Sequence, residues 1–192
     1  GVQTVQRLCV GFVTAAATIA DVQRVQAIMT APEFMGCDLL LSQTVPKDVH
    51  QFVPAAEVPS IRSASMAGST LCADVAQLAI PRYHIAASDS FFQRSPYKNF
   101  DEPPATKKNV ITRFITLAPC NQTKDKAKKW LHALDLEPLA YMPADSLAAE
   151  PAGTTDLPYM KIPTADARKR ARADKPSFDP SALEESKGDG KP

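Results

Sequence analysis

The sequence predicts an α+β domain followed by an extended tail. A strand-like segment followed by a helical pattern occurs twice, first over residues 5–16 and 18–29 and again over 110–117 and 123–134. The chain has 192 residues, of which 44% are hydrophobic, so it can bury one ordinary core. From residue 143 onward, proline, alanine and charged residues replace any periodic pattern.

The first strand and helix have clear local signals. Residues 5–16 alternate and then run apolar, as a strand does. Thr18 is the expected N-cap of the helix, and Asp21 completes a capping box three residues later. We expect one helix face to carry the apolar side chains of Val22, Val25 and Met29, and Pro32 to end the helix.

The middle of the chain predicts a second strand and a long insertion. Residues 37–45 form the strand, which Pro46 stops. The insertion covers residues 46–108 and contains one helix over 63–80, with an apolar stripe of Leu71, Val75, Leu78 and Ala79. Residues 82–108 show no regular period but are rich in aromatic rings, so we expect them to pack on the domain itself or on a partner.

The third strand and second helix complete the predicted domain. Residues 110–117 form the strand, and the helix over 123–134 turns Ala127, Trp130, Leu131 and Leu134 inward. A short strand over 136–142 would lie at a sheet edge because Pro138 lacks a backbone donor. The boundaries that follow are a domain over 1–142 and a Pro-rich, charged tail over 143–192.

This order of elements corresponds to the βαββαβ pattern of a ferredoxin-like split βαβ sandwich. Leu8-Cys-Val-Gly-Phe and Arg113-Phe-Ile-Thr-Leu resemble the first and third strands of an RNA-recognition motif, and Lys126-Ala-Lys-Lys-Trp-Leu resembles its second helix. In that family, aromatic rings on the sheet stack on RNA bases. Here Cys9 and Thr112 stand at two of the three ring positions and only Phe114 keeps a ring. The resemblance therefore implies a sheet face used for protein contacts.

No residue pattern predicts catalysis, a cofactor or a metal, so we expect the protein not to be an enzyme. The three histidines and four cysteines show no metal-site spacing, and no glycine-rich nucleotide loop occurs. His84, Ser88 and Asp89 are close in sequence, but sequence proximity does not make a catalytic triad. Cys9 and Cys37 lie in apolar runs, where a cysteine usually behaves as a small buried hydrophobic residue.

Two groups of residues are candidates for binding partners. The aromatic side chains predicted to bind other protein subunits are Tyr83, Phe91, Phe92, Tyr97, Phe100, Tyr159 and Phe178. The basic side chains that would bind RNA, in an alternative interpretation, are Lys107, Lys108, Arg113, Lys124, Lys128, Lys129, Arg168, Arg170 and Arg172. The net charge of only +1 favours the protein partners.

These observations predict a non-catalytic accessory subunit of a large assembly. We expect a mitochondrial energy-transducing complex, either the respiratory chain or ATP synthase, with the chain peripheral or on the matrix side. Gly1 fits removal of a presequence, although loss of the initiator methionine explains it as well. No apolar run is long enough to span a bilayer. The alternative is a component of a ribonucleoprotein such as a mitochondrial ribosome.

Overall fold

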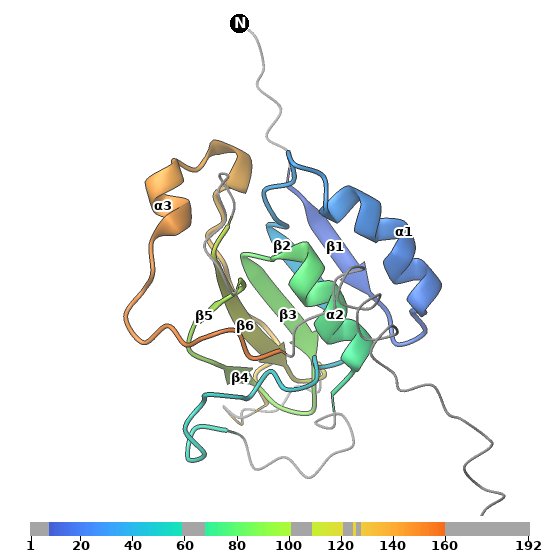
Figure 1. Cartoon of the computed structure of the whole chain (residues 1–192). Coiled ribbons are helices and arrows are strands. Elements are labelled where there is room, and N and C mark those ends of the chain that lie inside the picture. Colours follow the sequence, from blue (N-terminus) through green and yellow to red (C-terminus); the bar gives the residue numbers. More distant parts are fainter. Residues whose placement is uncertain (1–7, 59–67, 101–108, 121–124, 126–127, 160–192) are drawn as a thin grey trace, which may run out of the picture. The chain divides into compact units, whose positions relative to one another are not determined.

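A β-sheet with both parallel and antiparallel strand pairs forms the centre of the computed structural model (Figure 1). The structure describes residues 8–58, 68–100, 109–120, 125 and 128–159. The α-helices are α1 (Ile19–Met29), α2 (Thr70–Ala79) and α3 (Ala144–Ala148), and η3 (Leu139–Tyr141) is a 3₁₀ helix. The strands are β1 (Val10–Val13), β2 (Leu39–Ser42), β3 (Tyr83–Ala87), β4 (Phe92–Gln93), β5 (Tyr97–Lys98) and β6 (Ile111–Leu117).

The ferredoxin-like topology is not confirmed, because the main strands run parallel. β1, β2, β3 and β6 are neighbours in that order, and each pair is parallel. The short strands β4 and β5 both pair with β6 in the antiparallel direction. Parallel neighbours need crossover connections, which α1 supplies between β1 and β2 and α2 supplies between β2 and β3. The coarser expectation of a domain that mixes helices with a sheet is confirmed.

The start of α1 is confirmed as the capping box that the sequence predicts. The Thr18 hydroxyl accepts a hydrogen bond from the Asp21 backbone N–H, and the Asp21 carboxylate accepts one from the Thr18 N–H. These bonds satisfy two backbone donors that a helix start leaves without intrahelical partners. Nevertheless, no residue of α1 is fully buried, and the helix packs on α2. α1 therefore contributes few buried contacts to the domain.

The second helix packs more deeply than the first. Its N-cap is Ser69, whose hydroxyl accepts from the Cys72 backbone N–H. α2 packs on β1 and β2, and its buried side chains are Cys72, Ala73, Val75, Ala76 and Ala79. Their partners in the core come from the facing side of the sheet and include Val13, Leu40, Ala86 and Phe114. None of the helices in the described part of the chain is long and apolar enough to cross a membrane.

Two segments differ from the sequence expectation. The stretch from 82 to 108 was expected to be irregular, yet its start forms the central strand β3, flanked by β2 and β6. Residues 129–138 form no helix, and residues 139–141 are a 3₁₀ turn rather than a strand. Trp130 is accordingly 42% exposed instead of packed inward. Tertiary packing outweighs a lysine-rich local pattern that has few apolar contacts to gain.

A buried arginine joins distant parts of the chain and extends the domain beyond residue 142. The Arg94 guanidinium donates to the carbonyls of Val49 and Gln51 and, at 2.6 Å, to the Thr155 hydroxyl. It also lies 4.7 Å from the ring centre of Tyr97, which is buried. The hydroxyls of Tyr97 and Tyr159 form a hydrogen bond of 3.0 Å. Residues 143–159 therefore belong to the packed domain rather than to an extended tail.

Candidate functional site

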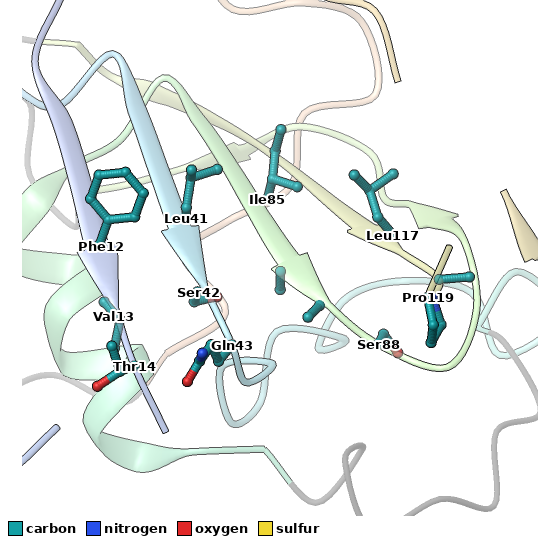
Figure 2. A pocket seen from close by; sticks show the side chains of 13 residues that line it. Phe12, Val13, Thr14, Leu41, Ser42, Gln43, Ile85, Ser88, Leu117 and Pro119 are labelled. Carbon is teal, nitrogen blue, oxygen red and sulfur yellow. The ribbon is translucent and has the colours of Figure 1, made fainter. Parts of the chain in front are cut away.

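An apolar hollow of about 490 Å³ lies at the carboxyl ends of the four parallel strands (Figure 2). Parallel strands bring their carboxyl ends to the same edge of a sheet, which is where α/β folds most often place a binding site. The side chains that line the hollow include Phe12, Leu41, Ser42, Ile85, Ser88 and Leu117. We therefore take this edge as the candidate site.

Large apolar side chains stand together on one face of the sheet. Phe12 is opposite Leu41 in the register, and Leu41 is opposite Ile85. Figure 2 shows these three side chains and that of Leu117 rising from the same side of the sheet. The Phe12 ring is 73% exposed, whereas the other three side chains are half-buried. We call Phe12, Leu41, Ile85 and Leu117 the apolar face.

The two sides of the sheet are covered to different extents. Side chains alternate along a strand, so Leu40, His84 and Phe114 point away from the apolar face, and all three are fully buried. On the β6 side, the Ala118 N–H donates to the Lys129 carbonyl, and the Arg82 guanidinium donates to the Glu137 carbonyl. These two hydrogen bonds hold residues 129–137 beside β3 and β6, whereas Phe12 on β1 stays open to solvent.

A serine and a histidine form a potentially nucleophilic pair at this edge. The Ser42 Oγ lies 2.9 Å from Nε2 of His84. The same hydroxyl donates its single hydrogen to the Thr44 carbonyl at 2.8 Å. Both contacts of this hydroxyl are satisfied at once only when Nε2 carries the hydrogen and donates to Ser42, which is the reverse of what a general base does. Burial also lowers the pKa of His84 to about 3, so the ring is a poor proton acceptor.

The other polar groups at this edge do not complete a catalytic set. Nδ1 of His84 and Oγ of Ser88 have no hydrogen-bond partner within the described ranges, so no carboxylate orients the imidazole. His84 and Ser88, which lie close together in the sequence, are not joined by a hydrogen bond. Within the residues that the structure describes, no three His, Cys, Asp or Glu side chains are grouped to hold a metal ion. The arrangement fits a structural Ser–His contact.

The aromatic residues predicted to bind partners mostly pack within the chain itself. Phe92, Tyr97 and Tyr159 are buried in the core, so they contact this chain rather than another protein. Phe91 stacks on His132 with ring centres 6.1 Å apart. Tyr83 and Phe100 are half-buried, and Phe178 lies outside the described residues. The insertion therefore contributes to the core more than to an open surface.

The basic residues of the alternative RNA site are placed only in part. Lys128 and Lys129 are exposed, and the Lys129 ammonium lies 4.5 Å from the ring centre of Phe91. The Arg113 guanidinium is half-buried over the ring of Tyr83. The rest lie outside the described residues, namely Lys107, Lys108, Lys124, Arg168, Arg170 and Arg172. The described basic side chains form no grouping that suggests RNA binding.

Sequence reasoning missed the apolar face, although one signal was available. The segment Leu39-Leu-Leu-Ser42 is apolar on both sides of the strand, which is typical of a parallel strand covered on two faces. The contribution of Ile85 could not be read, because residues 82–108 were expected to be irregular. Cys9 was expected to be buried, yet it is exposed and lies beside Cys37.

No protein-family model matches the chain. The chain is similar to human CWF19-like protein 1, with 33% identity over 135 residues, which are 70% of this chain and 24% of the human protein. For CWF19-like protein 1 of Xenopus laevis the identity is 31% over 156 residues, or 79% of this chain and 28% of that protein. Rice zinc finger CCCH domain-containing protein 59 is 30% identical over 159 residues, or 80% of this chain and 24% of the rice protein.

These similarities correct the functional prediction from sequence. The expectation of a mitochondrial subunit of the respiratory chain or ATP synthase is wrong, because the relatives at 30–33% identity are CWF19-like proteins. The alternative of a mitochondrial ribosomal component is wrong for the same reason, and the mitochondrial location falls with both. The similarity to an RNA-recognition motif stays an untested prediction. The chain spans about a quarter of the length of the curated relatives it matches.

Proposed function

We propose that residues 8–159 form a non-catalytic protein-docking module, and that its apolar face binds a second protein layer of a longer, CWF19-like polypeptide. The observation that carries this proposal is the Phe12 side chain, which is 73% exposed on a parallel sheet. Parallel sheets in proteins are almost always covered on both faces. Among the residues that the structure describes, none forms such a cover over the apolar face at β1 and β2.

The chemistry of the apolar face supports a protein as its partner. Phe12, Leu41, Ile85 and Leu117 carry no charge and no hydrogen-bonding group. Exposed apolar patches on a folded domain mark sites of protein contact. In the relatives, the remaining polypeptide is long enough to provide such a partner. The matched residues are only 24–28% of the CWF19-like protein 1 of human, orangutan, mouse and frog.

The geometry of Ser42 and His84 supports a non-catalytic role. The hydroxyl hydrogen of Ser42 is engaged by the Thr44 carbonyl, and the imidazole is buried, neutral and without a carboxylate partner in the described residues. A serine nucleophile needs a nearby base that can take its proton. We infer that this pair joins β2 to β3 beneath the apolar face.

Replacing Phe12 by lysine tests the docking proposal. In the 192-residue chain alone, Phe12→Lys is expected to change the free energy of unfolding little, because the ring already faces solvent. In a longer polypeptide the lysine would be buried without a partner beneath an apolar layer, so we expect the free energy of unfolding to fall by about 2 kcal/mol or more. A suitable polypeptide is human CWF19-like protein 1 in which residues 8–159 of this chain replace the segment of the human protein that they match. Urea unfolding measures both values.

The matched control is Gln26→Lys, which places the same charge on an exposed position of α1. We expect this substitution to leave the free energy of unfolding unchanged in both contexts. An equally small effect of Phe12→Lys in the chain alone and in the longer polypeptide would mean that no layer covers the apolar face.

A further inference from the structure

Two cysteine side chains meet at the amino ends of the first two strands. Cys9 directly precedes β1 and Cys37 lies two residues before β2, and their sulfur atoms are 3.6 Å apart. The Cys9 carbonyl accepts hydrogen bonds from the backbone N–H groups of Asp38 and Leu39, at 2.9 and 3.2 Å. The Cys9 N–H in turn donates to the Asp38 carboxylate at 2.7 Å. The strand pairing therefore holds the two thiols within a short movement of bonding distance.

The two thiols differ in their access to solvent. Cys9 is exposed and borders a hollow of about 540 Å³ that is also lined by Ala27, Ile28 and Leu139. Cys37 is only 2% exposed. A small reagent in solution would therefore meet the sulfur of Cys9 first. Cys37 is available mainly to a group already attached to Cys9.

We infer that Cys9 and Cys37 form a redox modification site, in which a low-molecular-weight disulfide such as oxidised glutathione converts the two thiols into an intramolecular disulfide. In the first step the Cys9 thiolate attacks one sulfur of oxidised glutathione and releases one glutathione thiolate. In the second step the Cys37 sulfur attacks the Cys9 sulfur, and the second glutathione leaves. Both thiol protons end on the two glutathione molecules, which are reduced as the two cysteines are oxidised.

Burial assigns different roles to the two sulfurs. It raises the pKa of the Cys37 thiol to about 12, so this group stays protonated and unreactive toward reagents in solution. The second step proceeds through the small fraction of Cys37 that is thiolate, because the Cys9 sulfur is held beside it, and the departing glutathione thiolate takes up the proton that Cys37 has lost. Cys9 is therefore the entry point, and Cys37 is the resolving thiol.

The disulfide would fasten a lightly anchored part of the fold. The segment between the two cysteines contains β1 and all of α1, and α1 has no buried residue. Closing this loop removes conformations from the unfolded chain and so stabilises the native state. We expect oxidation to raise the melting temperature by roughly 5 to 10 °C.

The test treats the folded 192-residue chain with oxidised glutathione and maps its peptides by mass spectrometry without reduction. We expect a linked pair of peptides containing Cys9 and Cys37, which dithiothreitol separates, together with the rise in melting temperature. Cys120 is the internal control, because it is exposed and no described residue places a second sulfur beside it. It should keep a bound glutathione.

A variant separates the two steps. In Cys37→Ala we expect Cys9 to hold glutathione as a stable adduct, with no rise in melting temperature on oxidation. A wild-type chain in which Cys9 keeps its glutathione while Cys37 stays a free thiol would overturn the inference. The wild-type result decides the question alone if the variant does not fold, and it does not depend on the docking proposal.

Discussion

Phe114→Ala is expected to lower the free energy of unfolding by about 3 to 5 kcal/mol, because it empties the centre of the core. Phe114 is fully buried on β6, in register with His84 on β3. Its ring meets the His84 imidazole edge-on, with ring centres 5.2 Å apart. The neighbouring strands are paired on both sides and cannot close the space that the ring leaves. Urea unfolding at neutral pH measures the loss.

The control is the same substitution on the opposite face of the sheet. Phe12→Ala removes an equal side chain from a position that is 73% exposed, so we expect a loss below about 1 kcal/mol in the chain alone. Losses of similar size at the two positions would contradict the assignment of a covered and an open face.

Acid is expected to destabilise the fold through His84. Burial lowers the pKa of His84 from 6.5 to about 3, so between these values the unfolded chain binds a proton that the native chain does not. The stabilisation from the neutral ring is fully present above pH 6.5 and is lost as the pH falls toward 3. At pH 4 the loss from this group amounts to about 3 kcal/mol.

Comparison with His84→Asn isolates this effect from that of the carboxyl groups. Urea unfolding of both proteins from pH 7 to pH 4 should show a steeper decline for the wild type, whatever the stability of the variant at pH 7. His132→Gln serves as the comparison: His132 is half-buried, and partial burial and the nearby Lys129 ammonium lower its pKa as well, so this substitution should flatten the decline less than His84→Asn does. Parallel declines for the wild type and His84→Asn would show that His84 is not a buried neutral ring.

Local signals in the sequence predicted the elements whose cause is local. The capping box of Thr18 and Asp21 is encoded within four residues, and it starts α1 as expected. The apolar run of β6 and the apolar stripe of α2 were also visible, because each needs only its own period. The helix predicted over 123–134 is absent along residues 129–134. Its apolar side chains have the helical period, but none of them is buried there.

Long-range pairing decided what the sequence could not predict. β3 contains a histidine and follows a proline, so it resembled a loop, and its strand character depends on β2 and β6 on either side. The apolar face takes one side chain from each of four strands, and only the parallel register brings Phe12, Leu41 and Ile85 into one row. Likewise, Cys9 and Cys37 are neighbours only because β1 pairs with β2.

The most direct test of the docking proposal is the rate at which maleimide labels a cysteine at position 12. Phe12→Cys and Gln26→Cys would each be labelled in the 192-residue chain and in the longer CWF19-like polypeptide described above, with sites assigned by peptide mass spectrometry. We predict that position 26 reacts at the same rate in both, whereas position 12 reacts at least about tenfold more slowly in the longer polypeptide because a protein layer covers it. Equal rates at position 12 in the two proteins would contradict the proposal.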